Sequence, residues 1–194
     1  MPIFQCYDFI ISRFLRRKGQ DMQIRTEYKT VEFMLPAYSE IPGVGLFLEQ
    51  VSKYINEYLI PLGEPELTGS MISNYVKKGI IANPVKKQYG REQIAYLIFI
   101  AIAKTVLSLE DITTMIELQR SHTDVETAYG YFREKFIEIL EAVFESKTID
   151  VLHGEELIVT LAQNIMITAA HKIYLDITFD GMKEVRTGNE EESS

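Results

Sequence analysis

Residues 67–89 read LTGSMISNYVKKGIIANPVKKQY, and this stretch decides the fold. Thr68 is a residue type that caps the start of a helix, and Gly79 stands where a left-handed helix stop belongs. A helix between them has one apolar and one polar face. The apolar face holds Met71, Ile72, Tyr75 and Val76. We expect Ile80-Ile81 to start a strand, Asn83-Pro84 to turn it and Val85–Tyr89 to return, which predicts a short β wing beside a helix-turn-helix.

The flanking residues predict the rest of a winged helix-turn-helix. A helix is expected from Gly45, because apolar side chains recur there every four residues and Pro61 ends the run. The repeating residues are Phe47, Val51, Ile55 and Leu59. A second helix is expected from Arg91 to about Val106, with its buried side at Ile94, Leu97, Ile98, Ala101 and Ile102.

The C-terminal half predicts a helical bundle. Ser108-Leu109-Glu110-Asp111 and Thr123-Asp124-Val125-Glu126 resemble capping boxes, so each is expected to begin a helix. The second of these helices carries a wide apolar stripe at Tyr129, Phe132, Phe136, Ile139, Leu140 and Val143. A last helix, from about Glu155 to Tyr174, is apolar on more than one side and needs cover from several directions. The fold class is therefore mainly α, a winged helix-turn-helix followed by a helical C-terminal bundle.

Four regions follow from this pattern. Residues 1–43 form an N-terminal extension, partly irregular, and residues 44–120 form the winged helix-turn-helix domain. Residues 121–186 form the helical C-terminal region, which we expect to mediate dimerisation because its last helix is so apolar. Residues 187–194, TGNEEESS, have the composition of a disordered acidic tail.

Charge is distributed unevenly along the 194 residues, although the net charge is −8. Residues 1–63 are balanced, residues 64–104 carry six basic and three acidic side chains, and residues 105–194 carry seven basic and eighteen acidic ones. The local excess of positive charge decides what a surface attracts within a Debye length of roughly 8–10 Å. A single cysteine, and apolar runs all shorter than the roughly 18 residues that span a bilayer, indicate a cytoplasmic protein without membrane contact.

The polar face of the first helix and the basic wing predict a contact with double-stranded DNA. Asparagine pairs with adenine in the major groove, and lysine and arginine contact phosphates. The expected DNA-contacting residues are Ser70, Ser73, Asn74, Lys77, Lys78, Lys86, Lys87 and Arg91. The positive patch of one protomer is small, so we expect a homodimer that reads two half-sites.

The same stretch resembles two families. Leu67 to Ile112 is similar to the MerR-type winged helix in Tyr75, in the Gly-Ile-Ile exit at Gly79, in Pro84 and in the basic wing that ends at Tyr89. Ser73-Asn74 replaces the Arg-Tyr pair usual in that type. Residues 36–120 resemble still more closely a bacterial family catalogued as domain of unknown function 1836, through Glu40-Ile41-Pro42 and the run from Leu67 to Tyr89. That family has no assigned activity.

Catalysis has no support in the sequence. His122, His153 and His171 lie far apart outside any metal-binding spacing, and no phosphate-binding glycine motif is present. We therefore expect a protein that is not an enzyme and needs no metal or cofactor. A transcriptional regulator is the leading hypothesis, with the effector unknown. A protein-interaction or assembly module that reuses a winged helix without DNA is the alternative.

Overall fold

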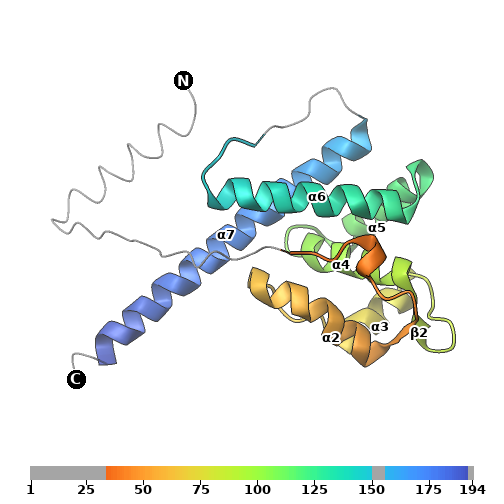
Figure 1. Ribbon diagram of the computed structural model, residues 1–194, viewed down its shortest axis with the longest axis horizontal. Helices are drawn as coiled ribbons and strands as arrows, with labels where there is room; N and C mark the ends of the chain where they lie inside the picture. Colours follow the sequence, from red (N-terminus) through yellow and green to blue (C-terminus); the bar gives the residue numbers. More distant parts are fainter. Residues whose placement is uncertain (1–33, 150–155, 192–194) are drawn as a thin grey trace. The chain divides into compact units, whose positions relative to one another are not determined.

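The structure is a computed structural model that describes residues 34–149 and 156–191, with side chains through Lys183. The described residues are mainly helical and belong to one compact unit that begins at Val31 (Figure 1). A 3-10 turn, η1 (Tyr38–Glu40), precedes strand β1 (Leu46–Phe47) and helix α2 (Leu48–Leu59). The remaining elements are η2 (Ile60–Leu62), α3 (Gly69–Lys77), β2 (Gln88–Tyr89), α4 (Arg91–Ala103), α5 (Leu109–His122), α6 (Val125–Phe144) and α7 (Leu157–Glu191).

Helix α2 buries the stripe that its sequence predicts, through Val51, Ile55 and Leu59. The helix begins three residues later than expected, at Leu48. Phe47 is its N-cap and stays half exposed, because the chain before it is extended and pairs as β1. The helix ends in η2, and Gly63 then adopts the left-handed conformation with a φ of 69°. Glycine reaches that conformation without steric cost, which explains the stop.

The wing differs from its prediction. Ile80 and Ile81 form no strand; both side chains are buried, whereas a strand would alternate them between core and solvent. The reversal lies at Lys86-Lys87 and not at Asn83-Pro84, since Val85 and Gln88 form the bridge that closes the turn. The returning strand β2 pairs antiparallel with β1, so Leu46 lies opposite Tyr89 and Phe47 opposite Gln88.

Helix α4 is the centre of the core. Eight of its thirteen residues are buried, including every apolar residue that the sequence assigned to its buried side. It packs against α2 on one side and against α6 and α7 on others. A helix that is apolar around most of its circumference needs such cover, and this position joins the wing and helix pair to the C-terminal helices in one core.

Helices α5 and α6 begin at capping residues. Ser108 accepts a hydrogen bond from the Asp111 amide, as predicted. At α6 the cap is Asp124, one residue after the expected Thr123, because the Asp124 carboxylate receives the Thr127 amide. Helix α6 buries Tyr129, Phe132, Phe136, Ile139 and Leu140 as predicted, while Val143 is half-buried.

Helix α7 is much longer than predicted. It was expected to end near Tyr174, yet it continues to Glu191, so residues 187–191 of the expected disordered tail are helical. Residues 175–183 contain Leu175, Ile177, Phe179 and Met182, which extend the helical pattern beyond Tyr174. The helix runs in the same direction as α6, since Phe132 and Ala162 line one cavity near their starts and Phe144 meets Tyr174 further along.

The segment before β1 is tied to the helices. Tyr129 donates a hydrogen bond to the Pro36 carbonyl at 2.9 Å, and Arg133 donates to the Leu35 carbonyl at 2.7 Å. Leu35 and Ile41 are buried, so the described end of the expected N-terminal extension is part of the core. Residues 1–33 of that extension lie outside the described residues. Within the described helices, none combines the length and apolar character needed to cross a membrane.

Candidate nucleic-acid interface

The solvent side of α3 carries the polar residues that the sequence assigned to it. Ile72 and Tyr75 are buried and fix the orientation of the helix. The opposite face is exposed at Ser70, Ser73, Asn74, Lys77 and Lys78. Met71 and Val76, expected inside, are half-buried at the edges of the apolar side. The predicted division between buried and solvated faces is therefore confirmed, while contact with DNA stays a prediction.

The start of α3 is attached to α2 through one asparagine. Asn56 accepts the Leu67 amide at 2.8 Å and donates to the Leu67 carbonyl at 3.3 Å. Ser52, one turn earlier on α2, donates to the same carbonyl. Thr68 then caps α3 by accepting the Met71 amide at 3.3 Å, as predicted. These bonds fix the N-terminal end of α3 relative to α2.

The end of α3 is attached from two other helices. Gly79 adopts a φ of 74°, and the Ile80 amide returns to the Tyr75 carbonyl at 3.0 Å, which closes the helix. Arg120 of α5 donates to the Ile80 carbonyl at 3.4 Å, and Gln93 of α4 donates to the Ala82 carbonyl at 2.8 Å. The connection from α3 to the wing is thus held by side chains that the sequence analysis did not single out.

The wing tip is a two-residue hairpin turn built from lysines. Val85 and Gln88 exchange both backbone hydrogen bonds, at 3.0 and 2.9 Å. Lys86 and Lys87 between them have φ values of 51° and 66°, which defines a type I′ turn. Asn-Gly and similar pairs favour this turn, whereas lysine pays a steric penalty for a positive φ. Both lysines are exposed, so the strained turn directs two cations into solvent.

Arg91 has a different position from the other cations. Its guanidinium donates to the Ile41 carbonyl at 2.8 Å and to the Ser39 carbonyl at 3.4 Å, and lies 5.5 Å from the centre of the Tyr38 ring. The side chain is half-buried. These contacts anchor residues 38–41 to the start of α4, which gives the Arg91 guanidinium a structural role and occupies the donors that a phosphate would need.

The groove between α2 and the start of α3 is acidic at its edges. Glu49 and Glu57 line it from α2 and Glu66 lines it just before α3, with Lys53 as the one cation among its lining residues. Ser70 and Ser73 border the same groove. Phosphates are repelled on this flank of α3, and the cations lie at the other end, around Lys77, Lys78 and the wing.

A buried carboxylate follows η2 in the chain. Glu64 follows Gly63 and is 7% exposed. Burial raises its pKa to about 7, and the carboxylate of Asp176 on α7 adds to the rise, whereas Lys172 and Lys104 oppose it. Burial also lowers the pKa of Lys104, and Glu64 opposes that change. The group is thus poised to change charge near neutral pH.

A metal site within the described residues requires that histidine and carboxylate side chains cluster. In residues 34–149 and 156–191, no group of three or more histidine, cysteine, aspartate or glutamate side chains is arranged to hold a metal ion. His122 and His171 each place Nδ1 2.8 Å from a carbonyl of the preceding helical turn. The third histidine, His153, lies outside the described residues.

A comparison with protein-family models identifies the family of this chain. The family model described as "Domain of unknown function (DUF1836)" matches residues 36–132, which is half of the chain. The matched residues run from the segment anchored by Tyr129 and Arg133 through α2, α3, the wing, α4 and α5 into α6. No curated protein and no solved structure matches the chain.

Proposed function

We propose that this chain, which belongs to the DUF1836 family, is a DNA-binding protein that regulates transcription as a homodimer through a MerR-like winged helix. The observation that carries the proposal is the exposed polar face of α3, followed directly by a hairpin turn with two exposed lysines. Nothing in the family description favours or opposes this function, because the description assigns none.

The order of the elements supports a winged helix. Strand β1, the helix pair α2 and α3, the β2 hairpin and helix α4 follow one another, and β1 pairs with the wing strand. The connection between α2 and α3 runs from Ile60 to Thr68 and is longer than the usual turn of three to four residues. The bonds from Asn56 and Ser52 to Leu67 compensate for this length, because they fix the start of α3 on α2.

Two classes of contact follow from the geometry. Asn74 and Ser73 lie mid-helix on the exposed face, where short polar side chains meet base edges in the major groove. Lys86 and Lys87 extend from the wing tip, and Lys77 and Lys78 from the end of α3, as partners for phosphates. Ser70 borders the acidic groove, so its role is at the edge of the interface.

The dimer surface we propose lies on α7. Leu175, Phe179 and Met182 are 47%, 56% and 36% exposed, and their spacing places them on one face of the helix. Met166 and Ile173 of the same helix are fully buried within the chain, so they belong to its core and not to the proposed dimer surface. Leu161 lies two heptads before Leu175 and is also exposed, at 40%. Apolar residues repeated in this way are typical of a helix that pairs with a second copy.

Selection of genomic fragments by the purified protein tests the DNA proposal and supplies a preferred site. Asn74→Ala is then expected to lower affinity for that site by about 1–3 kcal/mol while leaving binding to random duplexes nearly unchanged. Asn74 is exposed, so the variant should fold as the wild type does. Thr114→Ala, exposed on α5 and outside the proposed interface, is the control and should leave both affinities unchanged. Equal losses on specific and random DNA would exclude base readout by Asn74.

The acidic groove favours a second candidate function. Glu49, Glu57 and Glu66 around a groove between two helices suit a basic peptide rather than a nucleic acid. In that case the chain is a non-enzymatic interaction or assembly module. Retention on heparin at low salt and release at moderate salt would favour DNA, whereas failure to bind heparin or any selected fragment would favour the peptide.

A further inference from the structure

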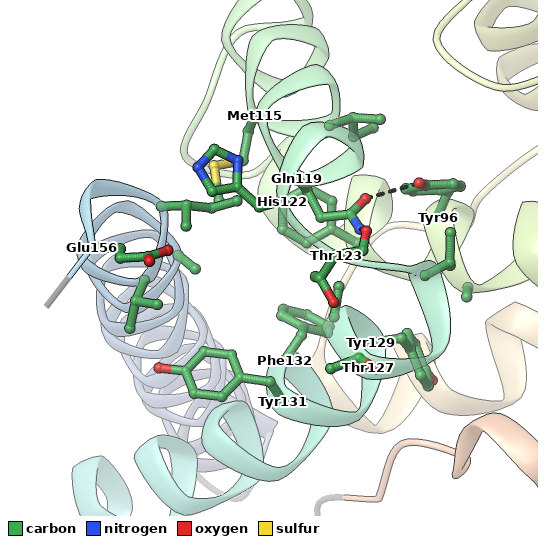
Figure 2. A pocket seen from close by; sticks show the side chains of 18 residues that line it. Tyr96, Met115, Gln119, His122, Thr123, Thr127, Tyr129, Tyr131, Phe132 and Glu156 are labelled. Atoms are coloured by element: carbon green, nitrogen blue, oxygen red, sulfur yellow. Dashed lines mark hydrogen bonds between the residues drawn. The ribbon is translucent and has the colours of Figure 1, made fainter.

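A cavity of about 340 Å³ lies among α4, α5, α6 and the first turns of α7 (Figure 2). Figure 2 shows its side chains arranged around an open centre, with Tyr96 of α4 on the side opposite Glu156, just before α7. The volume is near the lower end of the roughly 300–1,000 Å³ typical of small-molecule sites. The cavity is separate from the polar face of α3 and from the groove beside α2.

Small side chains keep this space open. Ala95 of α4, Ala128 of α6 and Ala162 of α7 all line the cavity. An empty cavity costs stability, and larger side chains at these three positions would close it. The retained space is what a site for a ligand requires.

The walls suit an aromatic ring. Phe99 and Phe132 pack edge to face with ring centres 5.4 Å apart, and Tyr129, Met115 and several aliphatic side chains add to the apolar lining. Rings of this kind stack on, or meet edgewise, a planar ligand, and the methionine sulfur adapts to its outline.

The polar groups of the wall favour a neutral ligand. Gln119 is satisfied by the chain: its Oε1 accepts from Tyr96 at 2.8 Å and its Nε2 donates to the Thr123 carbonyl at 2.8 Å. Thr127 donates to Asp124. Among the described residues that line the cavity, Glu156 is the one carboxylate and none is a lysine or arginine; Glu156 and His122 are both exposed. A charge placed deep inside would be desolvated without a partner.

From these observations we infer that the cavity is a binding site for a small, neutral, aromatic molecule. The inference concerns binding alone and does not depend on contact with DNA. Two other occupants are distinguished by the experiment below: an anionic amphiphile, and residues 150–155 of this chain, which precede Glu156 and lie outside the described residues.

N-phenyl-1-naphthylamine, a neutral aromatic dye whose emission rises in apolar surroundings, is the probe. The chain contains no tryptophan, so protein emission interferes little. The full-length wild type is expected to bind one dye per chain at saturation. Ala128→Phe fills the cavity and should weaken dye binding at least about tenfold, while its thermal unfolding temperature stays equal or rises. Ala142→Phe on the same helix lies outside the cavity lining and is the matched control, with unchanged binding.

Each contrary result overturns the inference. Absence of dye binding to the wild type, or equal binding by Ala128→Phe, would show that the cavity is not the site. Stronger binding of 1-anilinonaphthalene-8-sulfonate than of the neutral dye would exclude preference for a neutral ligand. Dye binding that occurs only after Val151→Ser/Leu152→Ser would show that this segment of the chain fills the cavity itself.

Discussion

Replacing the two wing lysines by Asn-Gly should make the protein more stable and its DNA binding weaker. Lys86 and Lys87 both have positive φ values, of 51° and 66°. Such a conformation costs an L-residue with a side chain roughly 1–2 kcal/mol, and glycine and asparagine avoid most of that cost. Glycine has more conformational entropy in the unfolded chain, and this offsets roughly 0.5–1 kcal/mol of the stabilisation. Relief at both residues, less this entropy, should therefore raise the free energy of unfolding of Lys86→Asn/Lys87→Gly by about 1–3 kcal/mol.

The same double variant should reduce the dependence of DNA affinity on salt. Each phosphate contact contributes roughly 0.9 to the slope of log affinity against log salt concentration. Loss of two lysines should lower that slope by about 1.8 per protomer and by about 3.6 for a homodimer, on specific and random sequences alike. Base readout by Asn74 is untouched, so the ratio of specific to random affinity should stay the same.

Urea unfolding gives the stability, and fluorescence anisotropy with a labelled duplex at several salt concentrations gives the slope. Lys86→Arg/Lys87→Arg is the matched control, because it keeps both the charge and the positive φ; neither quantity should change. A gain in stability with an unchanged salt slope would show that the wing lysines do not contact DNA. No gain in stability would refute the reasoning about strain in the turn.

Three further predictions concern the scaffold. Glu64 has a pKa of about 7 in the folded protein against 4.5 for the free side chain, so it contributes stability below pH 4.5 that is lost as pH rises to about 7. Glu64→Gln should remove up to about 3 kcal/mol of this pH dependence and stabilise the protein at pH 8. Urea unfolding from pH 4 to 8 measures this, and a variant whose stability changes with pH in parallel with the wild type would refute it. Phe179→Asp should convert the homodimer to a folded monomer in sedimentation, whereas Thr114→Asp, exposed on α5, should not; a monomeric wild type at tens of micromolar would reject the dimer. Asn56→Ala should cost about 1–3 kcal/mol, since it leaves the Leu67 amide without its acceptor, and Asn56→Asp, which keeps an acceptor, should cost less in the same unfolding measurement.

The local signals were sufficient for the helices around the wing. Thr68, Ser108 and Gly79 act within their own turn of chain, so the sequence predicts their positions without knowledge of the rest of the fold. The burial of α4 is likewise predictable, because a helix this apolar must be buried whichever elements pack against it. The division of α3 into a buried and a solvated face follows from helical periodicity alone.

Long-range pairing explains what the sequence did not predict. Gln88 and Tyr89 pair with Leu46 and Phe47, some forty residues earlier, and a reading of neighbouring residues favours the nearer Ile80-Ile81. An arginine in the sequence looks the same whether it binds phosphate or supports the fold. Only the structure shows that the Arg91 guanidinium donates to the Ile41 carbonyl, fifty residues earlier in the chain. The extension of α7 was missed because polar residues after Tyr174 have the composition of a tail, although their apolar neighbours keep helical spacing.

Arg120 connects the proposed ligand cavity with the end of α3 in the proposed DNA interface. Arg120 of α5 donates to the Tyr96 hydroxyl at 3.3 Å, lies 4.9 Å from the centre of the Tyr96 ring, and also donates to the Ile80 carbonyl, directly after α3. Tyr96 lines the cavity, so a ligand that shifts this ring also changes the bonds that hold the end of α3. Asn56 fixes the other end of α3 from α2. Under both proposals, a ligand is therefore expected to act on the Lys77 end of the helix, beside the wing, and so on the proposed phosphate contacts more than on the proposed base readout.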